Sequence, residues 1–250
     1  LPLVKNVPRS SVKVFTEVKL TDAAVEAVMP GVDLTAGQFD VAITPETVSV
    51  KGPAKLNGVA SKVAWIKPRG EGQAKIEIQT VLDSKLRSKL GIKLDDFMSG
   101  DVPVEIAIAG SEDGGRVANV SADLSDVSMK VAAAGWSRPA TAGTRATFKV
   151  IDDGKGGAKT VEDLKLSGKG LQVAGRIALK AGGGYKLIDL EQILLGEDDE
   201  LQVRMEPGED GTLIRLSGTR FDARPYIKSL TAPSKQKGDA AGGETGSRFL

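Results

Sequence analysis

The sequence predicts a mainly β protein, a long twisted antiparallel sheet or groove built from repeated β units with two or three short helices. Three observations support this prediction. Apolar and polar residues alternate in many short segments, Gly-rich turns separate these segments, and few segments have a helical period. Alternation places the apolar side chains of a strand on one face of the sheet, so we expect half-buried strands.

The clearest strands are four segments with apolar residues at every second position, namely 74–82, 102–110, 144–151 and 170–181. A fifth segment, "ELQVRMEPGEDGTLIRLSG" from Glu200, contains two alternating runs around a Pro-Gly-Glu-Asp-Gly turn. Turn residues of this kind between two alternating runs favour a β-hairpin.

Three segments favour short helices. "TDAAVEAVMPG" at 21–31 has Thr21 or Asp22 as a plausible N-cap and ends at Pro-Gly. "DSKLRSKLGI" at 83–92 continues the Leu spacing of four that starts at Leu82, and "KLIDLEQILLG" at 186–196 ends at Gly. We expect the piece that includes 83–92 to pack on the open face or at an end of the sheet.

A pair of similar segments 71 residues apart predicts an internal repeat of about that length, and a second pair suggests that a β unit is used more than once. "VAWIKPRGEGQAKIEI" and "AGWSRPATAGTRATFKV" share the spacing of Trp65 to Pro68 and of Trp136 to Pro139. "VEIAIAGSEDGGRVANV" and "LQVRMEPGEDGTLIRLSG" share a strand, an acidic Gly turn and a second strand. We expect residues 1–230 to form one β-groove segment and residues 231–250, rich in Gly, Ala, Ser and Lys, to be a flexible tail or linker.

Composition excludes several kinds of chemistry. The chain has no Cys and no His, so catalytic Ser-His and Cys-His pairs, zinc fingers and imidazole metal sites have no residues to form them. Its 34 Lys and Arg balance 33 Asp and Glu without a long basic run, which argues against nucleic acid as a partner. We therefore expect no catalytic residues, no metal site and no cofactor.

Three features that could suggest a calcium site, a phosphate loop or an aromatic binding platform are better explained as turns, loops and structural residues. "GEDDEL" at 196–201 lacks the alternating Asp spacing of a helix-loop-helix calcium site, so we interpret it as an acidic turn. The Gly-rich piece at 154–159 lacks the Gly-Lys-Ser/Thr order of a phosphate loop and is typical of a hairpin loop. Trp65 and Trp136 could stack on sugars or lipids, but we favour a structural role for both.

Several segments together resemble the AsmA-like superfamily of bacterial envelope proteins, in particular its YhdP-like branch. The resemblance rests on "LGIKLDDFMSGDVPVEIAI", "DLSDVSMKVAAAGWSRPATAGTRATFKV" and "LSGTRFDARPYIKSL", and it covers most of the chain from about residue 82 to 230. It implies a periplasmic segment of a long protein whose inner-membrane anchor lies outside this sequence. The absence of a signal peptide and of a long apolar run also leads us to expect an excised soluble piece.

The resemblance further implies a bridge-like lipid-transfer protein, in which neighbouring β repeats of the parent chain extend a groove that conducts phospholipid between the inner and outer membranes. Alternation identifies candidate residues for contact with the acyl chains, and these are Val104, Ile106, Ile108, Phe148, Leu171, Val173, Ile177, Leu179, Leu201, Val203 and Met205. An ordinary closed core would give the same alternation.

Two other function classes stay open at the sequence level. The chain could be a structural or interaction β module of the envelope that holds no lipid and assembles through its sheet edges. It could also be a carbohydrate-active protein, which would need a cleft with two carboxylates about 5 to 10 Å apart.

Overall fold

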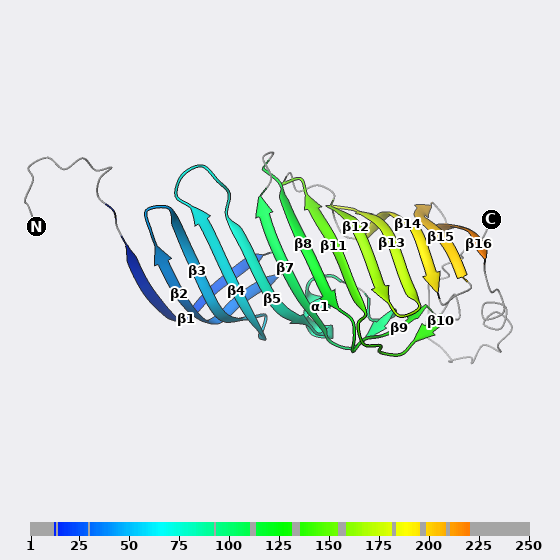
Figure 1. Cartoon of the computed structure of the whole chain (residues 1–250), viewed down its shortest axis with the longest axis horizontal. Coiled ribbons are helices and arrows are strands. Elements are labelled where there is room, and N and C mark those ends of the chain that lie inside the picture. The colour runs from blue at the N-terminus through cyan, green and yellow to red at the C-terminus, as the bar shows by residue number, and fades with distance from the viewer. Residues whose placement is uncertain are drawn as a thin grey trace, which may run out of the picture.

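A computed structural model describes residues 13, 15–29, 31–92, 94–110, 114–131, 136–154, 159–181, 184–195, 199–208 and 211–220. These residues form two antiparallel sheets and one short helix (Figure 1). The predicted tail at 231–250 lies outside the described residues. None of the helices in the described ranges has the length and apolar character needed to span a membrane.

Thirteen strands form one open, long sheet in which every strand is antiparallel to its neighbours. The strands follow one another in chain order, with β1 and β16 at the two edges, which confirms the predicted fold class. In order across the sheet they are β1 (Thr16–Met29), β2 (Val32–Ile43), β3 (Thr47–Leu56), β4 (Val59–Pro68), β5 (Lys75–Leu82), β7 (Val102–Gly110), β8 (Arg116–Asp123), β11 (Arg145–Asp152), β12 (Lys159–Gly168), β13 (Leu171–Leu179), β14 (Tyr185–Leu195), β15 (Asp199–Gly208) and β16 (Gly211–Arg220).

Two excursions of the chain leave this sheet and together form a second layer. Between β5 and β7 the chain forms α1 (Ser84–Lys89) and β6 (Met98–Ser99), and between β8 and β11 it forms β9 (Ser128–Val131) and β10 (Trp136–Arg138). The three strands pair in the order β10–β9–β6. Met98 and Met129 pack against a core cluster of the large sheet that includes Val104. The second layer therefore covers part of one face of the large sheet.

The sequence around α1 explains its short length. Asp83 caps the helix by accepting a hydrogen bond from the Leu86 backbone N–H at 2.7 Å. Leu86 is buried, and the helix stops just before Gly91, whose φ of +71° is accessible to Gly. The helix predicted at 83–92 is thus confirmed, and its segment packs on the sheet as expected.

The other two predicted helices are wrong, because residues 21–29 belong to β1 and residues 186–195 to β14. In β1, Asp22 and Ala27 have φ of +56° and +48°, values that no right-handed helix contains, and they lie among register shifts against β2. In β14, a shift between Leu190 and Ile193 puts an extra residue into the alternation. Irregular strand pairing gave both segments a spacing that imitates a helical period.

The β1–β2 hairpin bends behind β3 to β5 (Figure 1). Its register shifts allow the bend, which buries Leu34 and Phe39 in a cluster with Ile78 of the large sheet. At the hairpin tip, a Cβ added to Gly31 would lie 3.3 Å from the Lys89 carbonyl oxygen, so the tip reaches the end of α1. The hairpin and the second layer therefore lie on the same face of the large sheet.

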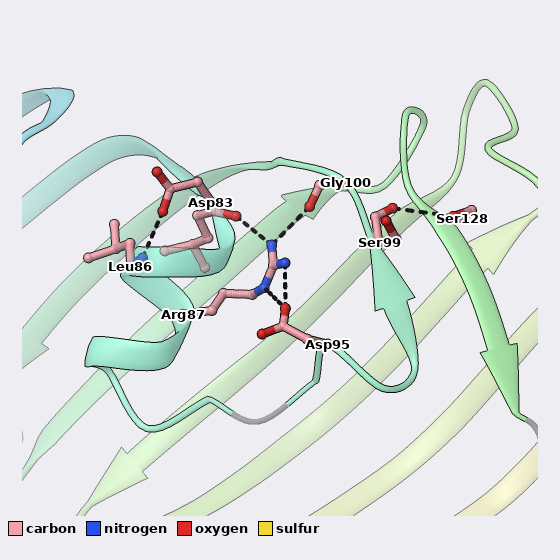
Figure 2. A network of polar contacts seen from close by, with 8 residues as sticks. Asp83, Leu86, Arg87, Asp95, Ser99, Gly100 and Ser128 are labelled. Carbon is pink, nitrogen blue, oxygen red and sulfur yellow. Dashed lines mark hydrogen bonds and ion pairs between the residues drawn. The ribbon is translucent and has the colours of Figure 1, made fainter. Parts of the chain in front are cut away.

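The second layer is joined to the large sheet by a buried arginine. The side chain of Arg87 is 4% exposed, and Figure 2 shows its guanidinium between Gly100 and Asp95. Its Nη1 donates to the carbonyl oxygens of Leu82 at 2.7 Å and Gly100 at 2.9 Å, while its Nη2 lies 2.7 Å from Asp95 Oδ1. The guanidinium of Arg87 thus donates hydrogen bonds both to the end of β5, at Leu82, and to the segment that leads into β7, at Gly100.

The two Trp motifs occupy different places in the fold. Trp65 lies in β4 and pairs with Val50 and Ile76 inside the large sheet. Trp136 lies in β10 and pairs with Val131 inside the small sheet. The shared Trp-to-Pro spacing therefore does not correspond to equivalent positions of one structural unit.

We predict that Arg87→Met destabilises the protein by about 1–3 kcal/mol, because the carbonyl groups of Leu82 and Gly100 and the Asp95 carboxylate lose their donor. Urea unfolding followed by circular dichroism would measure this change. Lys85→Met on the exposed side of the same helix is the matched control, and we expect it to change the free energy of unfolding by less than about 0.5 kcal/mol. Equal unfolding midpoints for the two variants would contradict a structural role for the Arg87 contacts.

Candidate functional site on the apolar face

One row of apolar side chains crosses the large sheet from edge to edge. Successive strand pairs place one member from each of the thirteen strands in register, and we call this row the apolar ladder. Its members are Val18, Val41, Val50, Trp65, Ile76, Ile108, Ala118, Val150, Val161, Ile177, Ile188, Met205 and Ile214. With neighbouring strands about 4.8 Å apart, the ladder follows the sheet for roughly 55–60 Å.

The apolar ladder is open to solvent beyond the part near the β1–β2 hairpin, where Val50, Ile76 and Ile108 pack against the core cluster that contains Leu34 and Phe39. None of its members is buried: Val18 is exposed and the others are half-buried. A second sheet packed face to face at about 10 Å would bury such a row completely. An uninterrupted apolar strip of this length is larger than the isolated apolar patches common on soluble proteins, and such strips mark binding surfaces.

Ile106, Val120 and Phe148 form the row directly beside the ladder, and the row beyond it, nearest the second layer, has both half-buried and buried members. It contains Val104, Ala122, Ala146, Leu166, Val173, Ile193 and Leu201 in register. Val104 and Ala122 are 3% and 6% exposed, where Met98 and Met129 of the second layer cover them. The second layer thus forms one side wall beside the open strip.

All of the predicted lipid-facing residues lie on this apolar face. Eight of them are half-buried and lie in the ladder or within two rows of it: Ile106, Ile108, Phe148, Val173, Ile177, Leu179, Val203 and Met205. Val104, Leu171 and Leu201 are 3%, 2% and 7% exposed, so they belong to the packed interior and do not present a surface to a ligand in this structure.

Sequence reasoning missed several members of the apolar ladder. Val41, Val50, Val161 and Ile188 were not among the candidates, although they lie in the same ladder as the candidates Ile108, Ile177 and Met205, and Val161 and Ile188 pair directly with Ile177. Alternation around each of these residues could have found them. Which rows are open depends on where the second layer lies, and no local pattern contains that information.

The opposite face carries mostly polar side chains along its middle rows. One row runs through Lys62, Gln79, Glu105, Ser121, Thr147 and Lys165. A shallow hollow of about 610 Å³ lies over this face, with Glu77, Asn119 and Lys149 also in its lining. A row nearer one strand end, which includes Val117 and Ile151, is apolar. The hollow therefore lies across the sheet from the apolar ladder.

One ion pair on the polar face shifts the pKa of both of its members. Lys149 Nζ lies 2.7 Å from Asp163 Oδ2, and this hydrogen bond lowers the pKa of Asp163 and raises the pKa of Lys149. Asp163 has φ of +53° at the β-bulge opposite Phe148. Both groups are exposed, so the pair contributes little to stability. Because the pair lies at a β-bulge, we interpret it as part of the local strand structure and not as a functional site.

No candidate metal centre was found in the part of the chain that the structure describes, where His and Cys are absent and no three acidic side chains gather. Comparisons of the chain with protein-family models, with curated proteins and with solved structures find no match. The geometry of the apolar face is therefore the basis for a functional proposal.

We predict that two Val→Ala changes on this face have different costs. Val104→Ala removes buried methyl groups under the second layer and should cost about 2–3 kcal/mol, whereas Val150→Ala in the apolar ladder should cost about 1 kcal/mol or less. Urea unfolding of both variants measures the difference. Similar costs would mean that the ladder is covered in solution, for example by self-association.

Proposed function

We propose that the apolar face is a groove that binds the acyl chains of phospholipids, in a non-enzymatic periplasmic segment of an AsmA-like protein. The observation that carries this proposal is the apolar ladder, which crosses all thirteen strands and is partly exposed to solvent from Ala118 in β8 to Ile214 in β16. The short motifs that resemble the AsmA-like superfamily give independent support. In the parent protein, an anchor in the inner membrane and further β repeats would extend the path toward the outer membrane.

The apolar groove would hold lipid by burial of hydrocarbon alone. Each buried methylene contributes about 0.8 kcal/mol, so a few methylenes along the ladder suffice for binding without a specific pocket. Because consecutive ladder residues are all apolar, an acyl chain meets a similar surface at each strand. A uniform surface suits movement along the groove, since no single position holds the chain much more tightly than the next.

The covered side of the face supports the same proposal. Met98 and Met129 of the second layer pack over the row that contains Val104, which leaves the apolar ladder as the open part beside a wall. A wall on one side limits the access of water to bound hydrocarbon while the other side stays open. This arrangement suits a ligand with an apolar body and a polar head.

A structural or interaction module is the second candidate function. The edge strand β1 exposes Val18, Leu20, Val25 and Val28 to between 41% and 48%. Edge strands with exposed apolar residues can pair with another chain. This function predicts association through β1 and no bound lipid, so the same experiments distinguish it from lipid binding.

The most direct test is native mass spectrometry of the chain purified from a Gram-negative host, followed by solvent extraction and lipid identification. We expect stoichiometric phospholipid. A clean apo mass, together with no uptake from added phospholipid vesicles, would contradict the proposal and favour an interaction module.

We predict that Ile177→Asp in the apolar ladder lowers the bound lipid at least severalfold, because a carboxylate in the strip opposes burial of hydrocarbon. Gln172→Asp adds the same charge on the opposite face of the same strand, and we expect it to leave the lipid content unchanged. Circular dichroism checks that both variants stay folded. Equal lipid content in the two variants would mean that lipid does not bind along the ladder.

A further inference from the structure

A row of charged side chains borders the apolar ladder on the same face. Arg116, Asp152 and Lys159 pair in register across β8, β11 and β12, and we call them the polar row. Each lies two positions from a ladder residue of its own strand, where the pairing is regular. Since side chains at positions two apart share a face, the polar row lies directly beside Ala118, Val150 and Val161.

The polar row lies on the side of the ladder away from the second layer. Along β8, Arg116 precedes Ala118, whereas the buried Ala122 under the second layer follows it. Along β12, Lys159 precedes Val161, and Leu166 packs toward the second layer. The open apolar strip thus has a packed wall on one side and a charged rim on the other.

Asp152 is the member of the polar row with contacts on both sides. Lys159 Nζ lies 3.5 Å from Asp152 Oδ2, and Asp152 Oδ1 accepts a hydrogen bond from the Gly154 backbone N–H at 3.0 Å. That backbone hydrogen bond, followed by the charges of Lys159 and Arg116, lowers the pKa of Asp152. At neutral pH the row therefore carries two positive charges and one negative charge.

Excess positive charge beside an apolar strip matches a ligand with hydrocarbon chains and an anionic group at one end. Arg and Lys both bind phosphate oxygens through charge-assisted hydrogen bonds. Arg116 and the side chain of Lys159, which is 51% exposed, are accessible from solvent. A fatty chain without a phosphate, such as that of a diacylglycerol, would leave these cations unused.

We propose that the polar row binds the phosphodiester headgroup of a glycerophospholipid whose acyl chains lie on the apolar ladder. This inference rests on the proposed function, and it adds that the groove distinguishes phospholipids from neutral lipids with the same chains. Arg116 and Lys159 supply the positive charge, and Asp152 moderates it so that the headgroup is held weakly enough to leave. The wall and the rim then orient each lipid across the groove.

The experiment uses the full chain, incubated with micelles of a neutral detergent that contain equal amounts of phosphatidylglycerol and diacylglycerol with identical oleoyl chains. Native mass spectrometry gives the ratio of the two lipids bound. We expect wild-type protein to favour phosphatidylglycerol and Arg116→Gln/Lys159→Gln to lower this preference by about three- to tenfold, the range for two exposed charge contacts. Diacylglycerol binding should stay unchanged in the variant.

Two further variants separate recognition from structure. Arg145→Gln/Lys165→Gln removes the same two charges from the polar face, and we expect it to keep the wild-type preference. Asp152→Asn keeps an oxygen for the Gly154 N–H but removes the negative charge, so it should raise the preference for phosphatidylglycerol. A merely structural role of the polar row would lower lipid binding in both row variants.

Each outcome has a distinct meaning. If neither lipid binds, the proposed function fails and this inference fails with it. If both bind but the double row variant keeps the wild-type preference, the groove binds lipid and the inference alone is overturned. If inorganic phosphate binds the lipid-free wild-type protein and is lost in the row variant while the lipid ratio stays constant, the row is a free-phosphate site and the inference is also overturned.

Discussion

The register of the strand pairs is the constraint on which the rest of the structure depends. Side chains of a strand alternate between faces, so a slip of one residue in any pair would move a whole strand's apolar residues to the polar face. The pairings from β3 through β11 show no register shift, and they fix the central ladder from Val50 to Val150. The apolar face is continuous because each strand pairing places apolar residues opposite apolar residues on the same side of the sheet.

Bulges preserve the apolar face where the sequence departs from strict alternation. In β12, Val161 and Leu164 are three residues apart, yet a shift near Asp163 pairs them with Ile177 and Gly175, which are two residues apart in β13, so both side chains lie on the apolar face. In β14, the shift between Leu190 and Ile193 has the same effect. A bulge adds one residue and increases the local twist, so the same feature that corrects the alternation also curves the sheet. The β-bulges thus account both for the curvature of the sheet and for the continuity of the apolar strip.

Partial cover distinguishes this sheet from an ordinary two-layer domain. A second layer over the whole face would make a closed core, whereas here α1, β6, β9 and β10 cover one side only and the β1–β2 hairpin bends over one end. The Arg87 contacts hold the first excursion against the strands from which it leaves. The result is an open apolar strip between a packed wall and a charged rim, a division of surfaces that suits an amphipathic ligand.

The sequence by itself determined the β class, the strands at 74–82, 102–110, 144–151 and 170–181, the final hairpin and the short helix near residue 84, because these depend on local alternation, turn residues and a capping Asp. It also placed the eleven candidate residues on one face. The helices expected at 21–31 and 186–196 failed because bulged strands imitate a helical spacing. Only the tertiary structure decided that Val104 is buried while Val150 and Ile177 are partly exposed, since burial depends on which distant segment covers each row. The polar row likewise emerged only from pairing, because Arg116, Asp152 and Lys159 lie on three strands whose register no local pattern specifies.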